Sequence, residues 1–394
     1  MAGTISRGIR APIVSAGDDI VKIVVDSVLK AQEEDGFSLK ERDIIAVTES
    51  VVARADGNYC TVDDIAEDVY EKFGDEIGIV FPILSRNRFA ICLRGIARGV
   101  KHVILQLSYP ADEEGNHLIT EDQLFYHNIN PYGDKLTERQ FRAIFGETKH
   151  PFTGIDYVEY YKQIIEEEGA EATIIFCNDP VAILSETTHV LCANIHDRFN
   201  TQRCIVETGV AEYVYTLDSI MNEPRNGSGY NASFGLLGSN KATESSVKLF
   251  PKNAQDIACS IQDEYYKRTG IFVEAMVYGD GAFKDPVGKI WELADPVVAP
   301  GYTEGLARYP NELKLKYLAD NEFKGLTGEA LENAIRARIS TKDSNLKGKM
   351  DSQGTTPRRI PDLVGSLCDL TSGSGDKGTP VVFIQGYFDN LASE

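Results

Sequence analysis

The alternation of helix-like and strand-like segments constrains the fold of this 394-residue chain more than any other feature. One amphipathic helix is indicated by apolar residues at helical spacing, at Ile20, Ile23, Val24 and Val28. Further helices are predicted for residues 155–168, 254–268, 312–324, 329–339 and 361–370. Thr61, followed by Asp64, predicts a helix that starts with a capping box. Apolar runs of strand length occur at residues 43–52, 102–107, 172–177, 181–184, 190–193, 271–278 and 381–384. We therefore expect a mixed α/β (α+β) fold.

Composition along the chain suggests how it is divided. Residues 112–151 are polar and rich in turn signals, which predicts an insertion. Residues 222–238 are rich in Gly, Asn and Ser, which predicts a loop. We expect an α/β core over residues 1–290 and a mostly helical region with a basic loop over residues 291–394.

The chain is strongly acidic, with a formal net charge of −20. This balance gives no electrostatic basis for binding nucleic acid, and an anionic membrane surface would repel the chain. A phosphate-bearing ligand would therefore need a local basic cluster. Two clusters occur, one with Arg86, Arg88, Arg94 and Arg98, the other with Arg336, Arg338, Lys342, Lys347, Lys349, Arg358 and Arg359. Either cluster could equally be a solvated face that offsets acidic neighbours.

The cysteines and the length of the apolar runs bear on location. The seven cysteines include no C-x-x-C pair, and most lie in apolar runs, where a free thiol behaves as a small core residue. No stretch reaches the roughly 18–20 apolar residues of a membrane helix, and no secretory signal is recognisable after Met1. We expect a cytoplasmic protein with neither a disulfide framework nor a cysteine zinc site.

Polar and acidic residues follow two of the apolar runs. One run leads into Asn194, His196 and Asp197, and another leads into Asp280 and Gly281. Ligands of open α/β sheets usually bind at the carboxyl ends of strands, and carboxylates there can hold Mg²⁺ or Mn²⁺ beside phosphate groups. Two such aspartates make a two-carboxylate metal site conceivable. The alternative at each place is an aspartate that only forms the next turn.

Two further segments carry weaker signals. Residues 372–379, with the sequence SGSGDKGT, do not fit the P-loop pattern because the lysine precedes a glycine, so a backbone nest or a flexible loop is the better interpretation. Residues 48–57 supply hydroxyls, the carboxylate of Glu49 and the guanidinium of Arg54 at the end of a strand. The chain has no G-x-S-x-G, no H-E-x-x-H and no G-x-G-x-x-G after a strand, which excludes several familiar chemistries.

Taken in order, these segments resemble the gamma-glutamyl ligase of the deazaflavin coenzyme F-420 (coenzyme F-420-0:L-glutamate ligase). The matching positions are residues 17–20 and 43–57, Glu186, Thr187, His189, Cys192, Ala193, Asn194, Asp197 and Asn200, residues 235–237, and Asp280, Gly281 and Phe283. The resemblance covers about the first 290 residues, and residues 112–151 match poorly. The last hundred residues extend beyond the typical ligase core.

The resemblance implies a specific chemistry and assembly. Family members use GTP and Mg²⁺ or Mn²⁺ to phosphorylate a carboxylate of the acceptor, and the amine of L-glutamate then displaces the phosphate. By position, Asp197 and Asp280 would be metal ligands, and Gly281 would offer its backbone. Nucleotide or substrate binding would involve Ser50, Arg54, Asn194 and His196. Separately from the resemblance, we expect Lys347, Lys349, Arg358 and Arg359 of the basic C-terminal segment to contribute to nucleotide binding. The resemblance also implies an intertwined homodimer.

The chain departs from the family pattern where positive charge is expected. Ser50 and Arg54 stand where the family usually has two lysines, Thr188 replaces an arginine, and Gly281 replaces a threonine. The basic C-terminal residues could restore this charge. A folate-type or other acceptor, a phosphotransferase that uses residues 372–379, and a nucleotide-binding module without catalysis remain alternatives, and the choice between GTP and ATP stays open.

Overall fold

The computed structural model describes residues 3–280, 295–308, 311–352, 359–372 and 378–389. The chain divides into two compact units, each built from segments that are distant in sequence. The first unit contains the described parts of residues 1–52, 253–281 and 297–394, and the second contains residues 53–252 and the described part of 282–296. The predicted boundary at residue 290 lies outside the described residues and stays a prediction.

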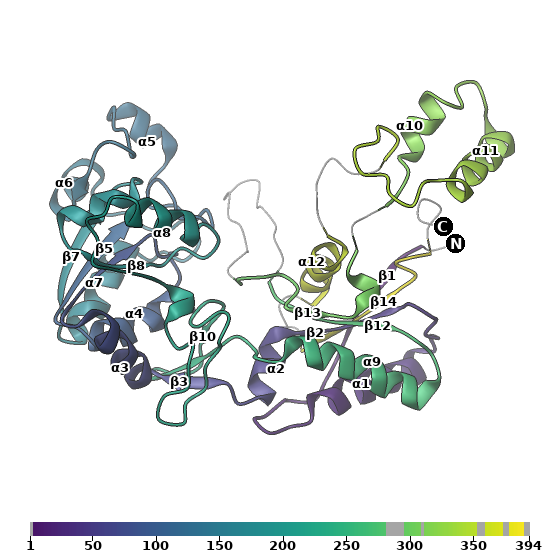
Figure 1. Cartoon of the computed structure of the whole chain (residues 1–394), viewed down its shortest axis with the longest axis horizontal. Helices are drawn as coiled ribbons and strands as arrows, with labels where there is room; N and C mark the ends of the chain where they lie inside the picture. The colour runs from purple at the N-terminus through teal and green to yellow at the C-terminus, as the bar shows by residue number, and fades with distance from the viewer. Residues whose placement is uncertain (1–2, 281–294, 309–310, 353–358, 373–377, 390–394) are drawn as a thin grey trace. The chain divides into compact units, whose positions relative to one another are not determined.

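A five-stranded sheet organises the first unit (Figure 1). Its order is β1 (Ile5–Ile9), β14 (Val381–Gln385), β2 (Ile44–Thr48), β12 (Glu274–Tyr278) and β13 (Gly301–Tyr302). The β2 and β12 strands are parallel, whereas β14 is antiparallel to both β1 and β2. Figure 1 shows α1 (Ile20–Asp35) and α9 (Ala254–Thr269) on one face and α12 (Ile360–Ser372) on the other. The last strand of the chain thus lies inside the sheet.

Both faces of this sheet are buried, which explains why its strands read as continuous apolar runs. Ile44 and Ala46 of β2 pack in one cluster with Val364 of α12. Ile45 and Val47 are also fully buried, and they belong to the opposite face because successive strand residues point to opposite sides.

Residues 311–352 form a small helical part of the first unit. It contains α10 (Leu315–Asp320) and α11 (Gly328–Ser340), and a 3₁₀ helix, η3 (Glu304–Leu306), precedes it. Its own apolar cluster consists of Leu313, Leu318, Ile339 and Leu346. The helices predicted in the C-terminal region are therefore present, although the first is shorter than the predicted 312–324.

A second, mostly parallel sheet organises the second unit (Figure 1). Its order is β6 (Leu136–Thr137), β7 (Glu171–Phe176), β5 (His102–Leu107), β4 (Glu76–Val80), β8 (His189–Cys192) and β9 (Tyr213–Thr216). All neighbours are parallel except β6, which is antiparallel to β7. One face packs against α3 (Val62–Phe73), α4 (Phe89–Arg98) and α7 (Tyr157–Glu167). The other packs against η1 (Pro180–Ser185) and α8 (Arg198–Val206).

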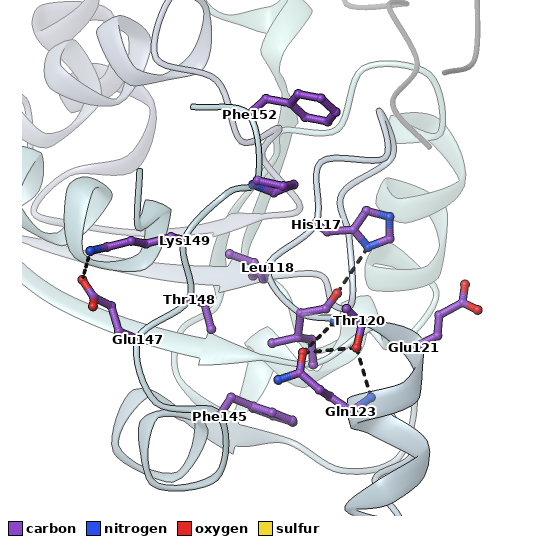
Figure 2. A pocket seen from close by; sticks show the side chains of 12 residues that line it. His117, Leu118, Thr120, Glu121, Gln123, Phe145, Glu147, Thr148, Lys149 and Phe152 are labelled. Atoms are coloured by element: carbon purple, nitrogen blue, oxygen red, sulfur yellow. Dashed lines mark hydrogen bonds and ion pairs between the residues drawn. The ribbon is translucent and has the colours of Figure 1, made fainter. Parts of the chain in front are cut away.

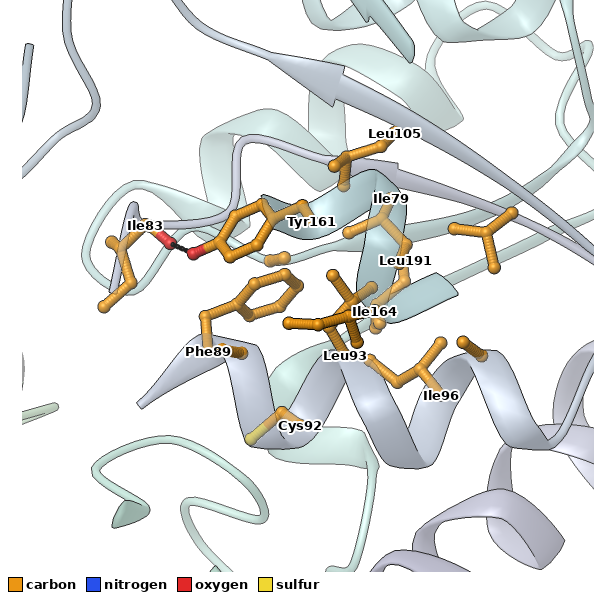
Figure 3. Packing of buried hydrophobic residues seen from close by; sticks show 14 of the residues in the cluster. Ile79, Ile83, Phe89, Cys92, Leu93, Ile96, Leu105, Tyr161, Ile164 and Leu191 are labelled. Atoms are coloured by element: carbon orange, nitrogen blue, oxygen red, sulfur yellow. Dashed lines mark hydrogen bonds between the residues drawn. The ribbon is translucent and has the colours of Figure 1, made fainter. Parts of the chain in front are cut away.

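The larger core of this unit lies between the sheet and the helices α3, α4 and α7. Figure 3 shows side chains of α4 and α7 against those of the strands, including Phe89, Leu93, Ile96, Tyr161, Ile164, Ile79, Leu105 and Leu191. Within this core the Tyr161 hydroxyl donates a hydrogen bond to the carbonyl of Ile83 at 2.6 Å. This bond ties the loop after β4 to α7, so the core positions one end of the sheet.

The remaining elements of the second unit are short. The strands β10 (Asn240–Lys241), β11 (Ser246–Lys248) and β3 (Tyr59–Thr61) form a small antiparallel sheet. The predicted insertion contains α5 (Glu121–Tyr126), β6 and α6 (Glu138–Phe145). The segment from 222 to 238 contains neither helix nor strand, as predicted, and follows a short 3₁₀ turn, η2 (Leu217–Ser219).

The predicted starts of two helices, which depend only on nearby side chains, are confirmed. Asp19 caps α1 by accepting the N–H of Lys22 at 3.0 Å. The capping box at the start of α3 is present, since Thr61 accepts the N–H of Asp64 at 3.1 Å and Asp64 accepts that of Thr61 at 2.7 Å.

Two strand predictions are wrong in part or in full. Residues 181–184 belong to the 3₁₀ helix η1, which Asp179 starts by accepting the N–H of Val181 and which has Pro180 in its first turn. The run at 43–52 is a strand only as far as Thr48, and α2 (Glu49–Ala55) follows directly. In both places the apolar run is short and is compatible with either a helix or a strand, so the spacing of its apolar residues cannot distinguish the two.

All seven cysteines are free, as predicted, and five of them are buried. Among the described residues, no helix combines the length and the apolar character needed to cross a membrane.

Candidate active site

The sheet of the second unit reverses its chain order between β4 and β8. From β4 the chain proceeds to β5 and β7 on one side, and then returns to β8 and β9 on the other. In open α/β sheets ligands bind beyond the carboxyl ends of the strands at such a reversal. The segment from Ala193 to Asp197 starts at this place, and the N–H of Ala193 bonds to the carbonyl of Val80 at 2.8 Å. The first sequence-predicted segment therefore lies at the position where this architecture favours a ligand.

Asn194 and Asp197 present oxygen atoms at this edge. The Asn194 side chain is buried, and its amide nitrogen donates to the Thr201 hydroxyl at 3.0 Å. Its Oδ1 is buried and has no hydrogen-bond partner among the residues that the structure describes. Asp197 is exposed and starts α8, but its side chain makes no capping hydrogen bond to the helix. The Asp197 carboxylate instead accepts a hydrogen bond from Nδ2 of Asn200 in the first turn of α8.

Two glutamates that follow β5 hold the same segment. Glu113 accepts the N–H groups of Ile195 and His196, the second at 3.1 Å. Glu114 is buried, and its Oε1 lies 3.7 Å from Nε2 of His196. We missed both residues in the sequence because they fall in the predicted insertion. An acidic run at residues 112–114 does follow the strand at 102–107 after a gap of four residues, but nothing in the sequence indicated its contact with Ile195 and His196.

Asp112 fixes the loop that carries these glutamates. Its carboxylate accepts the N–H of Leu84 at 2.7 Å, that of Glu114 at 3.0 Å and that of Asn116 at 2.8 Å. Burial nevertheless raises the pKa of Asp112 to about 6, because desolvation outweighs these hydrogen bonds. Asp112 thus links the loops after β4 and β5.

The second sequence-predicted edge belongs to the first unit. Tyr278 and Thr48 are paired at the ends of the parallel strands β12 and β2. Beyond them follow Asp280 on one strand, and buried Glu49 and half-buried Ser50 on the other. Parallel strands bring their carboxyl ends to the same edge, so hydroxyl and carboxylate groups meet there.

The C-terminal part of the chain reaches this edge as well. The N–H of Thr48 donates to the carbonyl of Pro380 at 3.0 Å. The hydroxyl of Thr379 donates to the carbonyl of Ser372 at 3.4 Å. Gly281 and residues 373–377 lie outside the described residues. The described ends of the SGSGDKGT segment, residues 372 and 378–379, together with Pro380, thus lie beside the edge that carries Ser50.

The predicted cationic residues lie on the surface. Arg54 lies in the last turn of α2 and is exposed, as is Lys347. Lys349 pairs with Asp343, and Arg359 pairs with Asp362 at 3.0 Å. Arg358 lies outside the described residues. These local pairs agree with the interpretation of a solvated basic face, and a role in nucleotide binding stays a prediction.

The N-terminal arginine cluster shows the same pattern. Arg94 contacts Glu168 at 2.5 Å, and Arg98 contacts the same carboxylate at 2.8 Å. Arg88 bonds to the buried Asp295 at 2.7 Å. These arginines offset acidic neighbours, which was the alternative interpretation of the cluster.

The oxygen atoms at both edges are of the chemical type that binds a hard cation. Mg²⁺ and Mn²⁺ prefer carboxylate and carbonyl oxygens, and Asp197 with Oδ1 of Asn194 offers such atoms. Among the described residues, no group of three or more His, Cys, Asp and Glu side chains is arranged to hold a metal ion. Asp197 belongs to the second unit and Asp280 to the first, and their joint role as metal ligands stays a prediction.

Comparison with known proteins decides the family. A sequence model of the family described as "F420-0:Gamma-glutamyl ligase" matches residues 8–386, which is nearly the whole chain. The chain belongs to this family. The family match ends at residue 386 instead of near residue 290, so it includes α12 and β14. In the fold, β14 lies between β1 and β2 in the sheet of the first unit. The expected division into a core over residues 1–290 and a C-terminal region over residues 291–394 stays a prediction.

One curated relative supports the same family. The "Coenzyme F420:L-glutamate ligase" of Methanothermobacter thermautotrophicus is 32% identical over 81 residues. The aligned part covers 19% of this chain and 31% of that protein. The match thus spans less than a third of the relative's length.

Proposed function

We propose that the chain is a GTP- and divalent-metal-dependent ligase that forms a gamma-glutamyl amide bond on a coenzyme F-420-0-like carboxylate. The proposal is carried by one observation: the family match over residues 8–386 includes both strand-end aspartates. The place of Asn194–Asp197 at the reversal of the parallel sheet supports it.

The proposed reaction proceeds through an acyl phosphate. An acceptor carboxylate oxygen attacks the γ-phosphorus of GTP, the bond to the β-phosphate oxygen breaks, and GDP leaves. The amine of L-glutamate then attacks the acyl carbon and loses a proton, the carbon–oxygen bond breaks, and phosphate leaves. Phosphorylation is needed because a carboxylate is a poor electrophile with no leaving group.

The residues at the edge of the second unit fit this scheme. Asp197 and Oδ1 of Asn194 would hold the cation, which when bound neutralises charge on the phosphoryl group. Glu113 fixes the backbone N–H groups of Ile195 and His196, so the segment that carries these ligands is held in place before substrate binds. We assign His196 to accept the proton of the attacking amine. Its ring is partly exposed, and its Nε2 lies 3.7 Å from Oε1 of Glu114.

A nucleotide-binding module without catalysis is the second candidate. It is favoured by Ser50 and Arg54 at positions where lysines are expected, and by the local ion pairs of Lys349 and Arg359. Such a module would bind GTP without turnover.

Trapping the acyl phosphate distinguishes these candidates. We expect GTP, Mn²⁺, coenzyme F-420-0 and hydroxylamine, with no glutamate, to yield an acceptor hydroxamate in equal amount to GDP, measured by mass spectrometry. Omission of the acceptor should abolish both products. GDP formation without hydroxamate would contradict the proposed intermediate. Hydroxamate formed only on a folate would change the acceptor alone, and GTP binding without any turnover would support the non-catalytic module.

A further inference from the structure

Two consecutive backbone N–H groups at the edge of the second unit already hold an anion, which is the side chain of Glu113. Its carboxylate accepts the N–H of Ile195 and, at 3.1 Å, the N–H of His196. Both residues lie between β8 and α8, where the sheet reverses its chain order. Successive N–H groups that point to one place form an anion-binding concavity. Here a carboxylate from another loop fills that concavity.

The carboxylate is the part of this contact that can move. Asp112 and Glu114, on either side of Glu113, are buried, whereas Glu113 is exposed. When its carboxylate leaves the N–H pair, water hydrates it, so the loss of the two hydrogen bonds is largely offset. Because Glu113 is exposed, the space that its carboxylate vacates opens to solvent, and a dissolved anion can reach both N–H groups.

The backbone that carries Glu113 is held in a short hairpin. A β-bridge between Ala111 and His117 closes it, and Asp112 fixes it through three backbone N–H groups. Beyond the hairpin, Nδ1 of His117 donates to the carbonyl of Ile119 at 3.3 Å, in the wall of a pocket of about 500 Å³ (Figure 2). Release of the carboxylate therefore needs only a rotation of the Glu113 side chain, and the hairpin keeps that side chain close to the N–H pair.

The charges at this edge already accommodate one anion on the N–H pair. Arg198 begins α8, and its guanidinium donates to the carbonyl of Ile195 and lies 3.0 Å from Asp218. Arg86 is exposed and belongs to the loop after β4, at the same edge of the sheet. An anion of single charge that replaces the Glu113 carboxylate leaves the charge on the N–H groups unchanged. The site therefore suits a compact oxyanion.

We propose that the N–H groups of Ile195 and His196 form a binding site for a compact oxyanion, and that Glu113 occupies this site as a tethered competitor. Phosphate and carboxylate groups share this chemistry. The contact is thus an intramolecular block, which an incoming anion removes by displacing the Glu113 side chain. The proposal does not rest on the ligase reaction, because it concerns the binding of a simple anion without nucleotide, metal ion or acceptor.

Titration calorimetry of the full chain with inorganic phosphate and with acetate tests the proposal. We expect the wild type to bind both anions weakly, because the tethered carboxylate competes at an effective concentration on the order of millimolar or above. Glu113→Ala should bind at least one of the two anions about tenfold more tightly. The anion that gains affinity distinguishes a phosphate from a carboxylate ligand. Glu113→Gln keeps one acceptor oxygen without the charge and should gain less.

Glu121→Ala is the matched control, since Glu121 is an exposed carboxylate of the same insertion that accepts neither N–H group. It removes one negative charge, as Glu113→Ala does, but should bind both anions as the wild type does. Hydrogen exchange of a peptide that spans residues 193–197 gives a second readout. Exchange should be faster in Glu113→Ala than in the wild type, and a saturating concentration of the bound anion should slow it again.

Three results would overturn the proposal. The first is equal anion affinity in the wild type, Glu113→Ala and Glu113→Gln, which would make Glu113 a structural contact only. The second is an equal gain in Glu121→Ala, which would assign the effect to net charge. The third is a gain in affinity without slower exchange at residues 193–197, which would place the anion elsewhere. Circular dichroism checks folding, and if Glu113→Ala does not fold, Glu113→Gln decides because it keeps the shape of the glutamate.

Discussion

Individual side chains at the edge of the second unit act mainly by holding backbone. Asp112 binds N–H groups of the loops after β4 and β5, and Glu113 binds those of the loop after β8. Neither side chain needs to touch a ligand to matter, because each fixes the position of segments that carry Asn194 and Asp197. The raised pKa of Asp112 makes its contribution measurable in solution.

The stability of the protein should depend on the protonation of Asp112. Its pKa is about 6 in the folded chain and near 3.8 when unfolded, so the folded state binds the proton more tightly. The resulting stabilisation is complete below pH 4 and is lost as pH rises through about 6. We therefore expect urea unfolding at pH 4, 5, 6 and 7 to show a larger decrease in the free energy of unfolding for the wild type than for Asp112→Asn. The difference between the two decreases should reach up to about 3 kcal/mol over this range. Parallel pH profiles for the two proteins would contradict this assignment.

Secondary-structure elements differ in how far their sequence determines them. The starts of α1 and α3 were predictable because Asp19, Thr61 and Asp64 act on N–H groups within three residues. Residues 181–184 were not, because four apolar residues carry no distinguishing period and the start of η1 at Asp179 decides their conformation. The edge that carries Asp197 was predictable from a strand followed by polar residues. The contribution of Glu113 was not, since it depends on a contact across 82 residues of sequence.

The β4 strand gives a prediction at this scale. A Cβ at Gly78 would come within 2.6 Å of Thr187 and 2.8 Å of Ile183, which pack over the sheet. Gly78→Ala should therefore lower the free energy of unfolding by about 1–3 kcal/mol through overpacking, as measured by urea denaturation. Gly133→Ala is a suitable comparison, because its Cβ would meet only the side-chain amide of Asn130 at 3.1 Å. Equal free energies of unfolding for the two variants would contradict this prediction, because they would show that η1 moves away from the added Cβ without loss of stability.

The whole molecule carries a formal net charge of −20, whereas the substrates of the proposed reaction carry phosphate and carboxylate groups. Many of its cations are already paired with neighbouring carboxylates, as Arg94, Lys349 and Arg359 show. A bound divalent cation is then the simplest means of offsetting the charge of a nucleotide, and this makes the strand-end aspartates central to the account. The intertwined homodimer and the cytoplasmic location stay predictions.

The most direct test of the ligase proposal is phosphate release from GTP with Mn²⁺, coenzyme F-420-0 and L-glutamate in three proteins. We predict that wild type releases phosphate only when acceptor and glutamate are both present. Asp197→Asn should lower the rate on the order of a hundredfold or more, since it removes charge that would hold the cation against the phosphoryl group. Asp75→Asn, which alters a surface pair with Lys101, should retain the wild-type rate. Wild-type turnover in Asp197→Asn would contradict the account.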